Sequence, residues 1–242
     1  MQFQVINIEE TDSTNHWLRE HGKGDMVVVA GYQTAGRGCG TNSWESERGK
    51  NLTFSVLLHP THVLANDQFI ISMANALALA DTLDRYTDGI SIKWPNDIYW
   101  NDSKLCGTLI ETRLQGNHIR DCIIGTGINV NQQRFLSDAP NPVSLYQLTG
   151  NDTDLKEVLE TFLYELGRLF DHWSPELMRE RYRQRLYRRQ GLFSYRDKEG
   201  LFLAELITVS DDGTLLLLDE SGKRRSYHFK EVTFIQHNEK SK

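Results

Sequence analysis

Four short segments place charged or polar side chains next to glycines, beside runs of apolar residues. They are residues 11–15 (TDSTN), 33–44 (QTAGRGCGTNSW), 93–107 (KWPNDIYWNDSKLCG) and 125–129 (GTGIN). In the second, Arg37 lies among glycines. Backbone N–H groups in consecutive turns can form an anion-binding nest, and a guanidinium adds a permanent planar charge. This loop is therefore typical of a carboxylate or phosphate site, although a tight loop between strands with structural glycines explains the same residues.

The glycine loop differs from two well-known nucleotide-binding loops. The chain has no GxxxxGK[ST] sequence, which excludes a Walker A loop. The loop also lacks GxGxxG spacing and is not followed by an amphipathic helix, so it is not a Rossmann fingerprint.

Two lysines lie near turns in the third segment. Lys93 and Lys104 each have an ordinary interpretation, a surface ammonium whose stem covers apolar residues. Lys104 differs because Gly107 follows it on an apolar run, so that backbone can come close to the ammonium. A compact positive charge there can meet a carboxylate or a phosphate.

The first and last segments are open to two interpretations. Ser13 and Thr14 can cap the helix that follows them, or their hydroxyls can point at a ligand. The glycines of residues 125–129, which end in Asn129, fit either a tight strand end or a ligand site.

The elements that must position these segments follow from the apolar patterns. Residues 26–32, 52–58, 104–112 and 122–130 are predicted as strands, so the glycine loop connects two of them. Residues 91–94 and 97–100 flank a Pro95-Asn96 turn. Helices are predicted over 68–86 and 154–173, and Asp154 with Glu157 suits a capping pair at the start of the second.

The C-terminal part of the sequence differs in its residue pattern, with a basic segment followed by short apolar runs. Residues 176–190 carry six arginines and are predicted as a helix with a basic face, which is either an ordinary solvated face or a docking surface for an acidic partner. After Gly191, short strands are predicted over 201–209, 214–219, 224–229 and 232–235. Such a small all-β module is expected to pack on the main domain.

Composition excludes several classes of protein. No window approaches 18 consecutive apolar residues, so no membrane span is predicted. The N-terminus lacks the features of a secretion signal, and three cysteines without CxxC spacing fit a reducing cytoplasm. A net charge of −6 gives no general attraction to nucleic acid. His59 and His62, the only close histidine pair, fall short of a usual metal set, so the metal ligands are left unknown.

The segments, in this order, resemble the biotin–protein ligases. That family has an STN near its start, a QxAGRG loop ending in tryptophan, a KWPND turn, a KLxGIL-type strand and a GxGIN strand end. The matching residues are 13–15, 33–44, 93–97, 104–111 and 125–129. The resemblance covers essentially the whole chain, and five motifs in one order make it specific.

The resemblance implies a fold and an activity. The expected class is α/β (α+β): a mixed sheet with packed helices, as in class II synthetase-like catalytic domains, over residues 1–188. A small SH3-like β-barrel is expected over residues 189–242. The implied enzyme activates biotin with ATP and Mg²⁺, forms biotinyl-5′-AMP, and transfers biotin to a lysine of the biotin carboxyl carrier protein of acetyl-CoA carboxylase. The oligomeric state stays open, with a homodimer as one option.

The resemblance also implies roles for single residues. Lys104 and Arg37 are the implied catalytic residues, because two anions must meet and their charge must be offset. The implied biotin-binding residues are Ser13, Thr14, Asn15, Gln33, Arg37, Gly38, Cys39, Lys104 and Gly107. The implied ATP- and adenylate-binding residues are Gly36, Arg37, Trp44, Lys93, Asn96, Asp97, Lys104 and Asn129. Asp97 is expected to meet either magnesium or the incoming lysine.

Two departures from the family pattern stand out. Many relatives have further basic residues directly after GRG, whereas Cys39, Gly40 and Thr41 follow here. The loop is therefore expected to hold its adenylate with less charge. In addition, few residues precede TDSTN, which leads us to expect a monofunctional ligase without an N-terminal DNA-binding domain.

Two other functions are weighed against this one. A lipoate or octanoate ligase or transferase of the related family has a similar catalytic fold, but lacks the pairing of KWPND with an AGRG loop. A non-catalytic biotin-binding sensor would need neither Arg37 nor Lys104, since binding the ureido ring alone requires no cation.

Overall fold

The computed structural model describes residues 1–40, 42–137 and 140–236, and within them the strands form two sheets. The larger is seven-stranded, in the order β1-β2-β3-β7-β6-β5-β4. β1 pairs with β2 in parallel and the other neighbours are antiparallel, so the sheet is mixed. Its strands are β1 (Gln4–Thr11), β2 (Met26–Gln33), β3 (Leu52–Leu58), β4 (Ile90–Lys93), β5 (Asp97–Trp100), β6 (Ser103–Gln115) and β7 (His118–Ile128).

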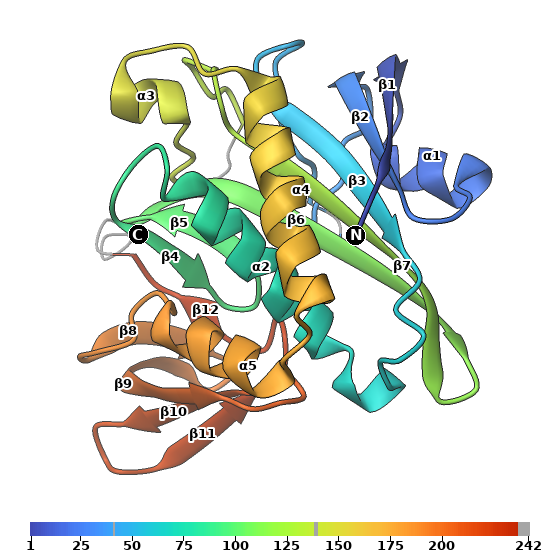
Figure 1. The fold of residues 1–242 in the computed structure, drawn as a ribbon. Helices are drawn as coiled ribbons and strands as arrows, with labels where there is room; N and C mark the ends of the chain where they lie inside the picture. Colours follow the sequence, from blue (N-terminus) through green and yellow to red (C-terminus); the bar gives the residue numbers. More distant parts are fainter. Residues whose placement is uncertain (41, 138–139, 237–242) are drawn as a thin grey trace.

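Helices cover both faces of this sheet (Figure 1). α2 (Phe69–Leu83) is apolar almost all round, and such a helix must be buried on every side. It packs against β4 and β5 and is covered by the amphipathic α4 (Leu155–Asp171) and by α5 (Pro175–Gln184). On the opposite face, α1 (Thr14–His21) packs Leu18 with Val28 and Leu57, side chains that alternate with the main core. A 3₁₀ turn, η1 (Ala65–Asp67), and a short α3 (Leu145–Thr149) complete these connections.

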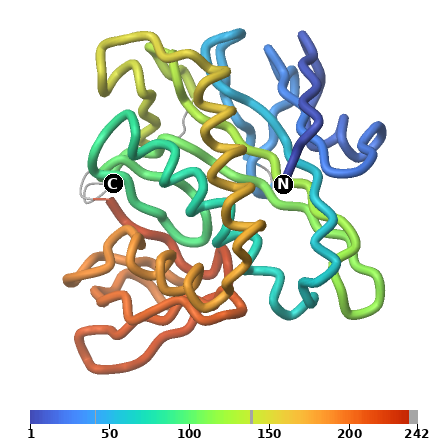
Figure 2. The backbone as a smooth tube through the Cα atoms, in the orientation of Figure 1, coloured from blue at the N-terminus to red at the C-terminus, as the bar shows by residue number. Residues whose placement is uncertain are grey.

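The C-terminal sheet lies next to α5 and to the β4 end of the larger sheet (Figure 1 and Figure 2). It is five-stranded and antiparallel, in the order β11-β10-β9-β8-β12, as expected for a small SH3-like module. Its strands are β8 (Phe193–Asp197), β9 (Gly200–Val209), β10 (Leu215–Asp219), β11 (Arg224–Tyr227) and β12 (Thr233–Phe234). One apolar cluster includes residues of both sheets, so the two share a core. The boundary between residues 188 and 189 stays a prediction.

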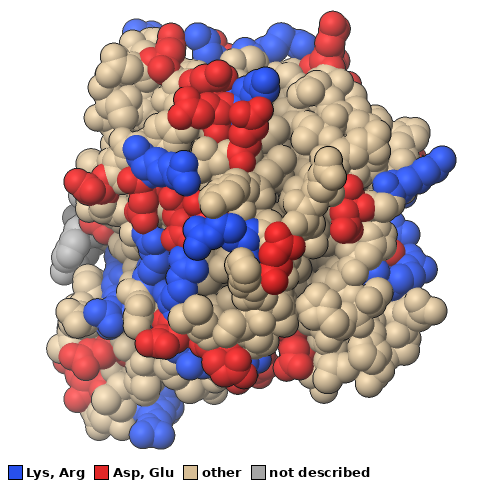
Figure 3. Space-filling view, in the orientation of Figure 1, with Lys and Arg blue, Asp and Glu red and all other residues tan. Residues whose placement is uncertain are grey.

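The basic segment forms a helix shorter than expected, and four of its six arginines, Arg179, Arg181, Arg183 and Arg185, form ion pairs with carboxylates of the described residues. Arg181 contacts the Asp81 carboxylate at 2.6 Å, and Arg185 contacts Asp81 at 3.0 Å and also Asp84. Arg183 contacts Asp211 of the C-terminal module at 2.9 Å. Figure 3 shows acidic and basic side chains adjoining one another on this side of the molecule. The arginines therefore join α5 to α2 and to the second sheet.

In the described part of the chain, no helix is long and apolar enough to cross a membrane.

Candidate active site

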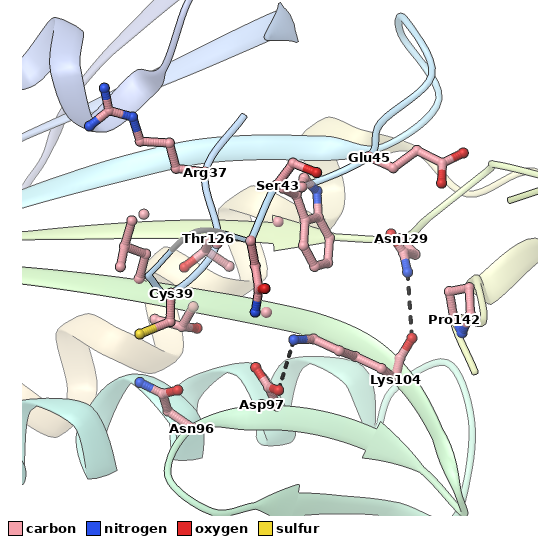
Figure 4. A pocket seen from close by; sticks show the side chains of 18 of the residues that line it. Arg37, Cys39, Ser43, Glu45, Asn96, Asp97, Lys104, Thr126, Asn129 and Pro142 are labelled. Carbon is pink, nitrogen blue, oxygen red and sulfur yellow. Dashed lines mark hydrogen bonds and ion pairs between the residues drawn. The ribbon is translucent and has the colours of Figure 1, made fainter. Parts of the chain in front are cut away.

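A cavity of about 750 Å³ collects the residues that the sequence singled out. It lies between the glycine loop, the start of α1, the 93–97 turn, β6, β7 and the loop that follows β7 (Figure 4). Of the expected site residues, only Gly36 is absent from its lining. The others line it together: Ser13, Thr14, Asn15, Gln33, Arg37, Gly38, Cys39, Trp44, Lys93, Asn96, Asp97, Lys104, Gly107 and Asn129.

One end of the cavity is a buried polar network around the start of α1. The Thr14 N–H and hydroxyl both donate to Gln33 Oε1, at 2.8 and 3.1 Å. Ser55 Oγ, on β3, lies 2.7 Å from Thr14 Oγ1 and 2.6 Å from Asn15 Oδ1. Ser13 gives α1 no side-chain cap, so its hydroxyl is not used in the way a capping interpretation requires. Because the Gln33 side-chain oxygen accepts both of these hydrogen bonds, the NH₂ group of the same amide remains as a donor for a ligand.

The Asn15 side chain is held mainly by the sheet. Its amide nitrogen donates to Glu111 Oε2 at 2.9 Å and to the Leu109 carbonyl at 3.4 Å. A Cβ at Gly125 would collide with its amide oxygen. Asn15 therefore lines the cavity, but its side chain is held by hydrogen bonds to the sheet. Gly125 of β7 leaves the space that this side chain occupies.

Trp44 forms the floor of the cavity because two strand glycines admit its ring. A Cβ at Gly107 would lie 2.7 Å from the indole, and one at Gly127 would overlap it. The backbone N–H of Trp44 donates to the Gly36 carbonyl at 2.9 Å, and a Cβ at Gly36 would lie 2.8 Å from the Trp44 carbonyl. The structure thus places Gly36 behind the tryptophan, where it shapes the loop and does not face the cavity.

Lys104 and Asp97 form an ion pair at the other end. The Lys104 Nζ lies 2.7 Å from Asp97 Oδ2, and both side chains are about a quarter exposed. The same ammonium is 5.7 Å from the centre of a Trp44 ring. Asn129 supports the backbone here, since its amide donates to the Val143 carbonyl at 3.1 Å and to the Lys104 carbonyl at 3.5 Å (Figure 4). A cation is therefore held in place on the cavity wall.

Lys93 and Asn96 flank this pair and are held by their neighbours. The Lys93 ammonium donates to the Tyr99 hydroxyl at 3.0 Å and lies over the Tyr99 ring. Burial raises the pKa of Tyr99 far above its ordinary value, so the phenol stays neutral. The Asn96 amide donates to Ser72 Oγ on α2 at 3.1 Å.

The side chain of Arg37 does not point toward that of Lys104. The side chain is exposed and its guanidinium points away from the Lys104–Asp97 pair (Figure 4). Its backbone pairs with Ser43 across the loop. Cys39 lines the cavity on the same loop, and Thr41 lies outside the described residues. The expected convergence of the two catalytic cations is therefore absent from this arrangement.

Several lining residues were missed by sequence reasoning. Glu45, next to Trp44, accepts from the N–H groups of Leu136 and Ser137, both at 2.8 Å. Burial acts to raise the pKa of Glu45, but these hydrogen bonds and one from Gln132 hold it below its ordinary value. Phe229 of the C-terminal module also lines the cavity. Glu45 directly follows the predicted loop but is not part of its motif, and Phe229 reaches the site from a distant segment, so neither has a local sequence signal.

Comparisons with known proteins extend over most of the chain. A model of the biotin/lipoate A/B protein ligase family matches residues 3–129. A bifunctional ligase/repressor BirA of Bacillus spizizenii is 30% identical over 234 residues, which cover 91% of this chain and 70% of that protein. A biotin–[acetyl-CoA-carboxylase] ligase of Paracoccus denitrificans is 32% identical over 187 residues, which cover 70% of this chain and 72% of that protein. A biotin protein ligase from Aquifex aeolicus, solved in complex with biotin and ATP, is similar with a TM-score of 0.79 and 28% identity, covering 96% of this chain and 99% of that one.

Proposed function

The chain belongs to the biotin/lipoate A/B protein ligase family, and on that premise we propose that it is a biotin–protein ligase. It activates biotin with ATP to biotinyl-5′-AMP and transfers the biotinyl group to a lysine of the biotin carboxyl carrier domain of acetyl-CoA carboxylase. The observation that carries this proposal is the single cavity, which joins a polar pocket at Thr14 and Gln33 to a fixed cation at Lys104. The names of the relatives in Paracoccus and Aquifex support it.

The polar end suits the biotin head group. A ureido ring offers N–H donors and one carbonyl acceptor. The Ser13 and Thr14 hydroxyls and the Gln33 amide can supply the matching acceptors and donors. Because the groups around them are buried, an analogue without the ring polarity would leave them unpaired, which favours biotin strongly.

The cationic end suits the first half-reaction. A carboxylate oxygen of biotin attacks the α-phosphorus of ATP; the new O–P bond forms as the bond to pyrophosphate breaks. Negative charge builds on the phosphoryl oxygens, and a positioned ammonium stabilises it without moving. Lys104 is that group, and Asp97 holds its ammonium in place until the substrates bind.

Arg37 joins the site by moving its side chain. The guanidinium is exposed and carries no ion pair among the described residues, so little is lost when it turns toward the reacting anions. Its fork can then hold the carboxylate and the α-phosphate together. The loop would also shield the acyl-adenylate from water.

The second half-reaction uses the same end of the cavity. The uncharged amine of the carrier lysine attacks the acyl carbon, the C–O bond to AMP breaks, and AMP leaves with the electron pair. Asp97, the carboxylate paired with Lys104, would accept a hydrogen bond from that amine and receive its proton.

Mg²⁺ enters with ATP as its counter-ion. No three His, Cys, Asp or Glu side chains converge to form a metal site in the residues that the structure describes. Magnesium usually keeps several waters and binds through one or two carboxylates together with phosphates. Asp97 fits as the carboxylate on the protein side, and the ion would neutralise part of the triphosphate charge.

Incubation with biotin, ATP, Mg²⁺ and a biotin carboxyl carrier domain tests the proposal. Mass spectrometry should find one added biotinyl group on the carrier, and none on a carrier whose acceptor lysine is replaced by arginine. Lipoate in place of biotin should leave the carrier unmodified. Modification by lipoate without modification by biotin would replace the proposal with a lipoyl enzyme, and binding of biotin without any product would support a sensor.

A further inference from the structure

A lysine of the C-terminal module reaches the tip of the glycine loop. Lys230 lies between β11 and β12, and a Cβ at Gly40 would collide with its Nζ and lie 3.5 Å from its Cε. Gly40 itself has φ of +73°, a conformation that side chains rarely adopt. The loop therefore leaves an opening at Gly40 that the Lys230 ammonium occupies.

The turn that carries Lys230 is held in a costly conformation. Lys230 has φ of +74°, in the left-handed region that residues other than glycine seldom occupy. The Glu231 N–H donates to the His228 carbonyl at 3.1 Å, and the His228 N–H donates to Glu231 Oε2 at 2.7 Å. These bonds fix the backbone that aims the lysine at the loop.

Contacts on the other side tie this turn to the cavity. Phe229 lines the cavity, and its ring centre lies 6.1 Å from that of Trp94. The Trp94 indole N–H donates to the Gly213 carbonyl at 2.9 Å, which fastens the second sheet to the 93–97 turn. Lys230 is not itself part of the lining, but it follows Phe229, which is, and its ammonium lies at Gly40, next to the lining residues Gly38 and Cys39.

The cavity needs such a charge if it takes ATP. Its charged lining residues are three cations, Arg37, Lys93 and Lys104, and two carboxylates, Glu45 and Asp97. The excess is a single positive charge, Lys104 is already paired with Asp97, and Arg37 points away. A triphosphate in a partly desolvated site requires more compensation than that. The Lys230 ammonium lies 5.9 Å from the centre of the Phe229 ring, and it has no carboxylate within ion-pair distance among residues 1–40, 42–137 and 140–236, so a phosphate could approach it.

We propose that Lys230 binds the phosphate chain of ATP from the second sheet, supplying to the glycine loop a positive charge that residues 38–40 lack. This inference rests on the proposed function. It gives the C-terminal module a direct part in the first half-reaction. It also gives a reason for glycine at position 40, since any side chain there would displace the ammonium.

The test compares Lys230→Gly with wild type in biotin-dependent exchange of pyrophosphate into ATP, which needs no carrier. Glycine suits the left-handed backbone, so the variant should fold at least as well. The KM for ATP should rise about tenfold, as for loss of one charge-assisted hydrogen bond, while the KM for biotin stays unchanged. Lys223→Ala is the matched control, because that lysine of the same module lies 3.8 Å from Glu199.

A double-mutant cycle sharpens the test. Gly40→Ala should raise the KM for ATP in the wild-type background and add little in Lys230→Gly, because both changes remove the same contact. An unchanged KM for ATP in Lys230→Gly would overturn the inference, as would a defect confined to transfer onto the carrier. Absence of biotin-dependent exchange in the wild-type protein would instead overturn the proposed function.

Discussion

The Lys104 ammonium and the Arg37 guanidinium have contrasting surroundings. Lys104 is 27% exposed and lies 2.7 Å from Asp97, so its position is set before a substrate binds. Arg37 is exposed and points away from that pair. Loss of Lys104 therefore removes a preorganised charge, whereas loss of Arg37 removes a group that must first move. In the proposed reaction, the two residues would therefore contribute by different routes.

Replacing Arg37 by alanine should slow adenylate formation and leave stability unchanged. The side chain is exposed, so we expect the free energy of unfolding to stay within about 0.5 kcal/mol of wild type. The rate of biotinyl-AMP formation in a single turnover should fall about 100-fold, as for loss of one transition-state donor. Arg48→Ala, an exposed arginine nearby that pairs with Glu10, serves as the control. A parallel loss of stability and rate would favour a structural role for Arg37.

Replacing Ser55 by alanine should weaken biotin binding through the groups that Ser55 positions. Its hydroxyl contacts Thr14 and Asn15, and a buried hydrogen bond lost in this way costs about 1–3 kcal/mol. The KM for biotin in the exchange reaction should rise while that for ATP stays constant. Thr53→Ala removes a buried hydroxyl from the same face of β3, bonded to the Ala30 carbonyl, and should leave both constants unchanged. Equal changes in both constants for the two variants would show that Ser55 acts only by stabilising β3 and not by positioning biotin-binding groups.

At the scale of single residues, sequence predicted which side chains gather but not how they are oriented. Thr14, Gln33, Lys104 and Asp97 line one cavity, as expected. The side-chain direction of Arg37 depends on a rotamer that no local pattern specifies. Ser55 was missed because it lies in a strand of wholly buried residues, where one serine among apolar side chains was the only signal.

At the scale of the elements, β6 and β7 shape the site through glycines, which have no side chains. Gly107 and Gly127 leave space for the Trp44 indole, and Gly125 leaves space for Asn15. Side chains alternate along a strand, so Gly125 and Gly127 lie on the same face as Ile123, which packs beneath α1. The glycines of these two strands therefore allow Trp44, at the end of the glycine loop, to pack directly against the sheet.

Replacing Gly127 by alanine should displace Trp44 and impair catalysis. The added methyl would overlap the indole, and overpacking of this kind costs about 1–3 kcal/mol. We expect the KM for ATP in pyrophosphate exchange to rise at least about tenfold. Gly167→Ala on α4 adds the same methyl where the nearest atoms are 3.8 Å away, and should be neutral or stabilising. Wild-type exchange kinetics in Gly127→Ala would contradict the role given to Trp44.

The C-terminal sheet should lose stability in acid. Hydrogen bonds from Tyr227 to Asp197 and from Ser221 and Arg225 to Asp219 hold the pKa values of both carboxyl groups below their ordinary range. Their contribution to stability is present above the unfolded pKa, about 4, and is lost as the pH falls through the lower folded-state values. Urea unfolding followed by circular dichroism should show this loss in wild type and a shallower pH dependence in Asp219→Asn. Glu205→Gln, at an exposed position of β9 outside this network, should follow wild type, and an identical pH slope in all three proteins would contradict the prediction.

Sequence patterns predicted most of the strands and the long helices, and missed β1 and β8. Residues 52–58 form β3 as expected, because a short run buried on both faces has an unambiguous pattern. Asp154 caps α4 by accepting from the Lys156 N–H at 2.9 Å. β1 was missed because it is an edge strand with exposed polar residues, so it lacks the apolar run that marks a buried strand. The basic helix was open between two interpretations, and its ion pairs with Asp81 and Asp211 favour the structural one.

On the scale of the whole molecule, the two sheets share both a core and a cavity. The apolar cluster runs through each sheet, and Phe229 lines the cavity together with residues of the larger one. The fold class could be predicted because the motifs occur in family order along the chain. The contribution of the second sheet could not, because it depends on how two distant segments pack.

The most direct test of the central proposal is exchange of labelled pyrophosphate into ATP in the presence of biotin, with Lys104→Ala as the comparison. Wild-type protein should exchange only when biotin is present, and lipoate should not replace it. Lys104→Ala should lose about 100- to 1000-fold in rate, because it removes the preorganised cation. Lys156→Ala, an exposed lysine of α4, should match wild type. Exchange supported by lipoate and not by biotin, or full activity in Lys104→Ala, would contradict the proposed biotin–protein ligase.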